Sequence, residues 1–163
     1  MRRFFIYLFM HIKLVILLVF ILINQKSSAQ NIQIVKFDAL KQCIYNKSDT
    51  VYVVNFFASW CKPCIQEMPE FLSFAIGIKN SKIKLVFVSV DFKKEQEKLL
   101  QIVQKFSLQN VYLLDETNAN NWINKIDKKW SGAIPATLIV KKGKHNKFIA
   151  DVISSQTLFK LIK

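Results

Sequence analysis

The chain has 163 residues, 52% of them hydrophobic, a length that suits one domain with a substantial apolar core. Its three cysteines are too few for a small domain held together by disulfides. The formal net charge of +13 comes almost entirely from lysine, and no arginine follows Arg3. This composition argues against nucleic-acid binding, in which arginine supplies bidentate contacts to phosphates and bases.

The first 29 residues have the pattern of a secretory signal peptide. Arg2 and Arg3 precede an apolar stretch with an uninterrupted core at 14–23, and Ser27 and Ala29 provide small residues for cleavage after Ala29. This core is short for a membrane span, although residues 4–23 together could almost cross a bilayer as an uncleaved anchor. Both alternatives predict that residues 30–163 form a periplasmic or otherwise extracytoplasmic domain, secreted or attached to the membrane at its N-terminus.

After this leader, strand and helix patterns alternate, which is typical of an α/β domain. Residues 32–37 are predicted to form a strand, and Asp38 is expected to cap a short helix over 39–45. Residues 51–57 are nearly all β-branched or aromatic, as in a central strand covered on both faces. The next helix is expected to begin near Pro63, because proline favours the first helical turn.

The second half of the chain continues the alternation and ends in a hairpin and a helix. Four further strands are expected, at 83–90, 111–114, 136–140 and 148–152. Three helices are expected between and after them, at 93–106, at 118–130 and from Ser154 or Ser155 to 162. The predicted order is β-α-β-α-β-α-β-α-β-β-α. Its early strands should be parallel with right-handed crossovers, and its last two should be antiparallel, in a central mixed sheet with helices on both faces.

Cys61 and Cys64 stand between a predicted buried strand and a predicted helix. A helix N-terminus offers unpaired N–H groups and a partial positive charge, so a thiolate there is stabilised and the thiol pKa falls. Cys61 precedes the first turn and is the expected nucleophile. Cys64 lies one turn inside the helix, where it can resolve a mixed disulfide. The pattern predicts a redox-active disulfide between these two cysteines.

Two other interpretations of the cysteine pair are a structural disulfide and half of a zinc site. A zinc site needs two more ligands, and downstream of the leader only Cys43 and His145 are available, neither in a paired motif. Haem attachment would need a histidine where Ile65 stands. We therefore expect no metal and no other cofactor. Cys43 itself is expected to be a small buried residue of the first helix, with a third redox cysteine or an intermolecular link as the alternative.

The residues around the pair resemble the TlpA-like branch of the thioredoxin superfamily. The resemblance is carried by the segment 54–64, which reads VNFFASWCKPC, and by Glu67-Met68-Pro69 after it. The run 85–91 followed by a helix is similar to the extra central βα unit of that branch, and GAIPAT at 132–137 resembles the loop that holds the superfamily's cis-proline. The resemblance spans about residues 32–163. It implies a thioredoxin-like fold and a thiol–disulfide oxidoreductase.

The resemblance also implies roles for individual residues. Pro135 would be cis and lie against Cys61, and the backbone of Ile134 would receive an extended substrate strand. Trp60 would pack beside the cysteines, although a core position is an alternative. Glu67 would lie near the thiols and tune them, with a solvent-facing helical glutamate as the alternative.

The chain departs from the family pattern at three places. Asn55 stands where ordinary thioredoxins have a buried aspartate, so any proton-accepting role would shift to Glu67 or to water. Ala136 follows the proline where the branch often has threonine. Lys62-Pro63 separates the cysteines instead of Gly-Pro, so the reduction potential of ordinary thioredoxin should not be assumed.

The expected partners are thiols and disulfides of exported proteins, with a membrane-bound electron donor. One alternative is a soft-metal chaperone for an ion such as Cu(I), but copper relatives space their cysteines more widely and add a histidine. A second is a thiol peroxidase. Such enzymes carry threonine three residues before the reactive cysteine, where this chain has Ala58.

Overall fold

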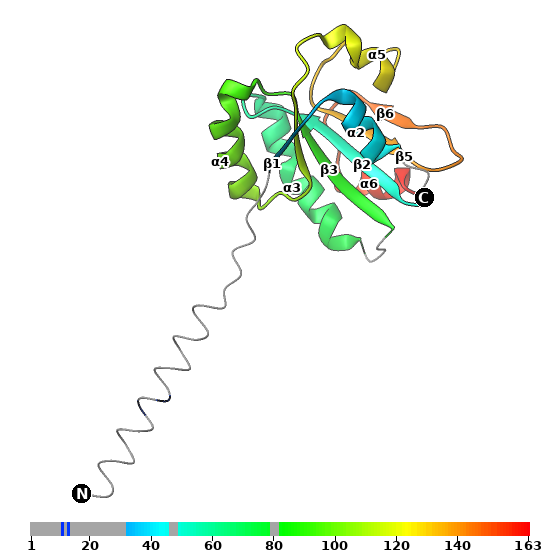
Figure 1. The fold of residues 1–163 in the computed structure, drawn as a ribbon. Helices are drawn as coiled ribbons and strands as arrows, with labels where there is room; N and C mark the ends of the chain where they lie inside the picture. The colour runs from blue at the N-terminus through cyan, green and yellow to red at the C-terminus, as the bar shows by residue number, and fades with distance from the viewer. Residues whose placement is uncertain (1–10, 12, 14–31, 46–48, 79–81) are drawn as a thin grey trace, which may run out of the picture.

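The computed structural model describes residues 11, 13, 32–45, 49–78 and 82–163 (Figure 1). The predicted leader, residues 1–29, therefore lies outside the described residues except at positions 11 and 13. In the part of the chain that is described, no helix is both long enough and apolar enough to cross a membrane.

Six strands form one mixed sheet in the spatial order β1-β4-β3-β2-β5-β6. They are β1 Ile32–Val35, β2 Val51–Phe57, β3 Ile83–Ser89, β4 Val111–Leu114, β5 Ala136–Val140 and β6 Lys147–Ile149. The first four strands pair in parallel, and β5 is antiparallel to both β2 and β6. The element order, the parallel early strands and the final antiparallel hairpin confirm the predicted fold class.

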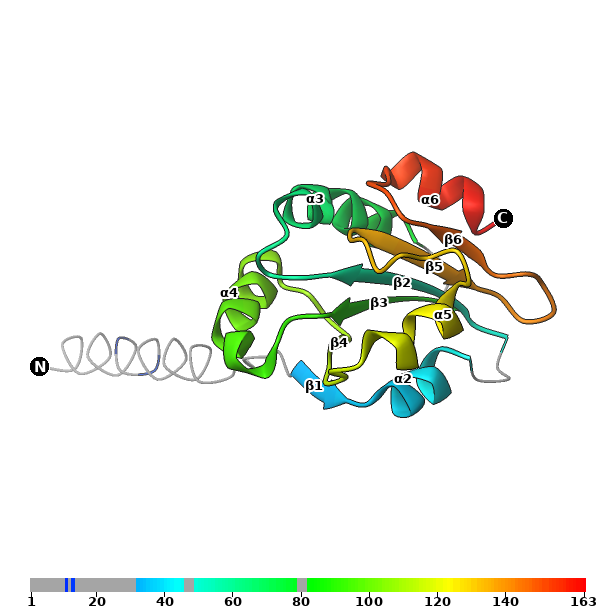
Figure 2. The ribbon, with the colours of Figure 1, turned by 90° about the horizontal axis from the view of Figure 1, so that it is seen from above.

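Helices cover both faces of the sheet, as Figure 2 shows. Within residues 32–163 as described they are α2 Phe37–Ile44, α3 Lys62–Gly77, α4 Gln96–Phe106, α5 Ile123–Ile126 and α6 Ser155–Leu161. The alternating side chains of β2 divide the core in two. Val53 and Phe57 pack with α3, α4 and α6, whereas Val54 and Phe56 pack with α2 and α5. The central strand is thus covered on both faces, as predicted.

The core holds α3 firmly against the sheet. Cys64, Met68 and Phe71 are fully buried on one side of this helix and belong to the same cluster as Phe57 and Phe87 of the sheet. Aromatic edge contacts join Phe71 and Phe57 to Phe87, with ring centroids 5.9 and 6.2 Å apart. The N-terminus of α3 is therefore fixed beside the end of β2.

Two local predictions about helices are wrong. The first helix begins at Phe37 with Lys36 as its N-cap, because the buried stripe of Phe37, Leu40 and Ile44 starts one residue before Asp38. Asp38 therefore lies in the first turn and is not the N-cap. The helix expected over 118–130 is reduced to a 3-10 turn, η2 Ala119–Asn121, and to α5. Asparagine is a poor helix former, and the Asn118 side chain bonds to a backbone N–H of the local turn instead.

Cys43 lies on the exposed side of α2, so the prediction of a buried cysteine is also wrong. The core-facing side of this helix is defined by Phe37, Leu40 and Ile44 at spacings of three and four residues, and Cys43 falls outside that stripe. Burial raises the pKa of Tyr112 on β4, and the neighbouring Cys43 adds to this shift. Cys43 is thus placed on a different element from the Cys61–Cys64 pair.

Candidate active site

Cys61 and Cys64 form a disulfide at the N-terminus of α3, with their Cα atoms 5.3 Å apart. After β2 ends, the Cys61 N–H donates to the Ala58 carbonyl at 3.1 Å and closes a turn. Cys61 is the N-cap of α3, and its Sγ accepts a hydrogen bond from the Cys64 N–H at 3.3 Å. Pro63 lies in the first turn. A thiolate on Cys61 would therefore meet both an N–H donor and the positive end of the helix.

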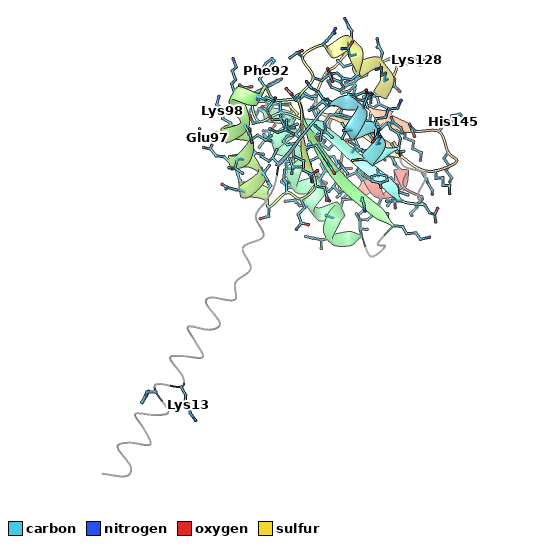
Figure 3. The ribbon with its side chains drawn as sticks, in the orientation of Figure 1. Lys13, Phe92, Glu97, Lys98, Lys128 and His145 are labelled. Carbon is cyan, nitrogen blue, oxygen red and sulfur yellow. A yellow bond between two sulfur atoms is a disulfide. The ribbon has the colours of Figure 1, made fainter. Side chains whose placement is uncertain are left out.

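Two aromatic side chains near this disulfide are exposed to solvent. One precedes Cys61 in the chain, and the other follows β3 at the same end of the sheet. Trp60 is 58% exposed, so it is not the core residue that was one alternative. Phe92, which follows β3 and is labelled in Figure 3, is 64% exposed. Cys61 is 5% exposed and Cys64 is fully buried, so Cys61 is the sulfur nearer to solvent.

The loop before β5 approaches the disulfide from the other side. The Ile134–Pro135 peptide bond is cis, and the Ile134 carbonyl oxygen lies 3.8 Å from Cys61 Sγ. Trp130 was not among the site residues predicted from the sequence. Its Nε1 donates to the Ala133 carbonyl at 2.8 Å and so fixes this loop. The Trp130 ring is buried against Phe56 at a centroid distance of 5.0 Å. Its place five residues before the proline was the available signal.

Replacing Trp130 with Phe is expected to lower the free energy of unfolding by about 1 kcal/mol, because the hydrogen bond to Ala133 is lost while most ring packing remains. Urea unfolding of both proteins measures this difference. Trp60→Phe is the control, since that ring is mostly exposed and should change stability by less than about 0.5 kcal/mol. Equal stability of Trp130→Phe and the natural protein would contradict the role given to this indole.

Glu67 is buried within α3, with only 2% of its surface exposed, so it is not the solvent-facing glutamate that was the alternative. It lies three residues after Cys64 on α3, a spacing that places both on one face of the helix. Its Oε1 accepts from Asn55 Nδ2 at 2.8 Å, and its Oε2 accepts from the Ile153 N–H at 3.1 Å. Burial raises the pKa of the Glu67 carboxyl, although these two hydrogen bonds act in the opposite direction.

A second buried carboxylate, Asp91, was not recognised as a site residue from the sequence. It follows β3, is 3% exposed, and accepts a hydrogen bond from the backbone N–H of Ser59 at 2.9 Å. A polar residue directly after a buried parallel strand was the available signal, since side chains from such strand ends meet at one edge of the sheet. His145, in contrast, projects from the β5–β6 connection into solvent (Figure 3).

Known proteins resemble this chain in sequence and in fold. The sequence profile of the AhpC/TSA family matches residues 26–147. The sporulation thiol-disulfide oxidoreductase A of Bacillus subtilis (strain 168) is 36% identical over 54 residues, which cover 33% of this chain and 31% of that protein. The thioredoxin-like protein YneN of the same strain is 26% identical over 101 residues, 60% of this chain and 58% of that protein. The chain thus matches less than two thirds of the length of either curated relative.

A solved structure shares the fold over most of the domain. The thioredoxin-related protein from Neisseria meningitidis serogroup B has a TM-score of 0.60 and 19% sequence identity, covering 69% of this chain and 82% of that one. Because the family profile matches about three quarters of the sequence, the chain is a member of the AhpC/TSA family, and the structural match shows a thioredoxin-like fold.

Proposed function

We propose that this chain is an extracytoplasmic thiol–disulfide oxidoreductase that reduces or exchanges disulfides in exported proteins. The observation that carries the proposal is the Cys61–Cys64 disulfide at the N-terminus of α3, with Cys61 Sγ beside the Ile134 carbonyl. The relative from Bacillus subtilis that is named a thiol-disulfide oxidoreductase supports the same activity.

The cycle starts from the dithiol. The Cys61 thiolate attacks one sulfur of a substrate disulfide, so a mixed disulfide forms and one substrate thiolate leaves. Cys64 then loses its proton and attacks Cys61 Sγ, which restores the Cys61–Cys64 disulfide and releases the second substrate thiolate. Two electrons pass to the substrate, and two protons complete its thiols. A membrane-bound dithiol donor would reduce the disulfide again.

The surrounding residues take distinct roles in this proposal. Trp60 offers apolar surface beside Cys61, and the backbone of Ile134 and Pro135 receives an extended substrate segment. Glu67 accepts the Cys64 proton, since a raised pKa brings a carboxyl closer to the pKa of a thiol. Asn55 holds the carboxylate in place through its amide.

The reduction potential tests the direction of transfer. The Glu67 carboxylate near Cys64 disfavours a thiolate there, which destabilises the reduced state and favours a reducing protein. We expect a potential at or below about −250 mV when residues 30–163 are equilibrated with dithiothreitol and read by thiol alkylation. A value near about −120 mV would contradict the reducing direction and make the protein an oxidant.

Peroxide reduction is a second candidate because the chain belongs to the AhpC/TSA family. The site argues against it, since Ala58 offers no hydroxyl at the position where thiol peroxidases carry threonine. The reduced protein should therefore consume hydrogen peroxide no faster than an ordinary small thiol. Rapid consumption that needs Cys61 would favour the peroxidase instead.

The proposed extracytoplasmic location rests on the sequence of residues 1–29. We propose that residues 1–29 are a signal peptide cut after Ala29 and that residues 30–163 form the working domain, with an uncleaved anchor as the alternative. The mass of the protein recovered from the cell envelope distinguishes the two, because an N-terminus at Gln30 requires cleavage.

A further inference from the structure

We infer that Asp91 is a positioning residue of the redox site, whose buried carboxylate holds the turn from Ala58 to Cys61 so that Cys61 stays aligned with Cys64. The inference rests on the proposed disulfide exchange. It adds a residue that follows β3 and acts through Ser59, since none of its hydrogen bonds within the described part of the chain reaches either cysteine.

The carboxylate of Asp91 accepts hydrogen bonds from both donors of Ser59, its backbone N–H and its hydroxyl. The Ser59 N–H lies 3.1 Å from Oδ1 and 2.9 Å from Oδ2, and the Ser59 hydroxyl donates to Oδ1 at 2.8 Å. Ser59 is the second residue of the turn that the Cys61 N–H closes on Ala58. Asp91 therefore fixes the segment that carries the nucleophile, two residues before it.

The carboxylate is itself locked in place. The Ser89 hydroxyl donates to Oδ2 at 2.6 Å, and the Asp91 N–H donates back to the same hydroxyl at 3.1 Å. The Val90 N–H donates to the Phe57 carbonyl at 2.9 Å, which extends the pairing of β3 with β2 up to this point. The end of β3 and the turn after β2 are thus joined by these hydrogen bonds.

Among the described residues, no ion pair joins Asp91 to a lysine. The nearby lysines are engaged elsewhere: Lys93 Nζ lies 2.8 Å from Asp115, and Lys94 Nζ lies 5.8 Å from the centre of the Phe92 ring. A buried carboxylate held only by hydrogen bonds is a poor source of stability, because its desolvation offsets much of what the bonds contribute. Its contribution is therefore the geometry that it imposes on the turn.

Asp91 affects the cysteine pair in two ways that have the same sign. A fixed turn raises the effective concentration of one thiol at the other, which stabilises the disulfide. A negative charge near Cys61 disfavours its thiolate, which destabilises the dithiol. Removing the charge and loosening the turn should both make the disulfide easier to reduce.

The test compares Asp91→Asn with Asp115→Asn, the latter a carboxylate that follows β4, pairs with Lys36 and Lys93, and does not contact Ser59. We expect Asp91→Asn to weaken the disulfide about tenfold in equilibrium with glutathione, a potential about 30 mV less negative, and Asp115→Asn to leave it unchanged. A purely structural role would lower the melting temperature of Asp91→Asn but leave this equilibrium as in the natural protein, and that result would overturn the inference.

Ser59→Ala keeps the test decisive if Asp91→Asn does not fold, because it removes only the hydroxyl donor. We expect Cys64 to resolve a mixed disulfide on Cys61 about threefold more slowly in this variant, as the loss of part of one charge-assisted hydrogen bond implies. An unchanged rate would overturn the inference. Failure of the natural protein to exchange disulfides at all is a separate result, which removes the proposed function and this role with it.

Discussion

Replacing Cys61 with Ser is expected to reduce disulfide exchange to the rate measured without protein. Cys61 is the cysteine nearer to solvent, and its sulfur accepts a hydrogen bond from the Cys64 N–H at the start of α3. It is therefore the cysteine expected to attack as a thiolate. Cys64→Ser should leave this attack intact but block resolution, because Cys64 is the sulfur that displaces the substrate. The measurement is reduction of a disulfide-bonded protein such as insulin, with non-reducing electrophoresis to detect mixed disulfides.

Cys43→Ser is the matched control for both variants. Cys43 is exposed on α2, a different element from the one that carries the pair. Its replacement should leave exchange and trapping unchanged. Activity that survives in Cys61→Ser, or a mixed disulfide trapped on Cys43, would be incompatible with the assignment of the nucleophile.

Replacing Glu67 with Gln is expected to have the second largest effect. An amide cannot accept from both Asn55 Nδ2 and the Ile153 N–H, so one buried donor loses its partner at about 1–3 kcal/mol of unfolding free energy. Under the proposed function, Cys64 would also lose the proton acceptor assigned to it, so resolution of mixed disulfides should slow. Urea unfolding and stopped-flow resolution kinetics measure the two effects separately.

The pH dependence of stability gives an independent test. Burial raises the pKa of Glu67 in the folded state above its ordinary value, so the folded protein binds the proton more tightly than the unfolded chain. The stability from this group is therefore complete below the ordinary carboxyl pKa and is lost as the pH rises through the raised value. Glu67→Gln should remove this decline, and an unchanged pH profile would contradict the burial of an ionisable carboxyl here.

Glu70 offers a control of opposite sign on the same helix. Its Oε2 accepts from the Ser155 N–H at 2.8 Å, and this hydrogen bond lowers the pKa of the Glu70 carboxyl. The stability from Glu70 is thus present at higher pH and is lost as the pH falls through the lowered value. Glu70→Gln should flatten the acid side of the profile and leave exchange unaffected.

The strand–turn–helix unit around the cysteines could be predicted from the sequence because its signals are local. The β-branched and aromatic run at 51–57 indicates a buried strand, and Pro63 indicates the first turn of α3. The cysteine spacing fits one turn of that helix. Local patterns of the same kind, alternating along the chain, also predicted the element order and the parallel early strands.

The hydrogen bonds of Asp91 and Glu67 could not be predicted from the sequence because they join elements distant in the chain. Asp91 reaches Ser59 only because β3 pairs in parallel with β2 in a register that sets Ser89 opposite Phe57. Glu67 meets the Ile153 N–H because the segment before α6 returns to α3, 86 residues further along the chain. The prediction of a helix over 118–130 was wrong for the converse reason. There a local hydrogen bond, from the Asn120 N–H to the Asn118 side chain, takes the place of the helical pattern.

A redox titration with site-resolved alkylation determines whether Cys61 and Cys64 act as one dithiol–disulfide couple. Residues 30–163 are equilibrated across a series of glutathione buffers, the thiols are blocked, and the modified cysteines are identified by mass spectrometry. We expect one two-electron transition in which Cys61 and Cys64 become blocked together, while Cys43 follows a separate course. A pair that stays disulfide-bonded throughout, or two cysteines that titrate independently, would contradict a working dithiol–disulfide couple.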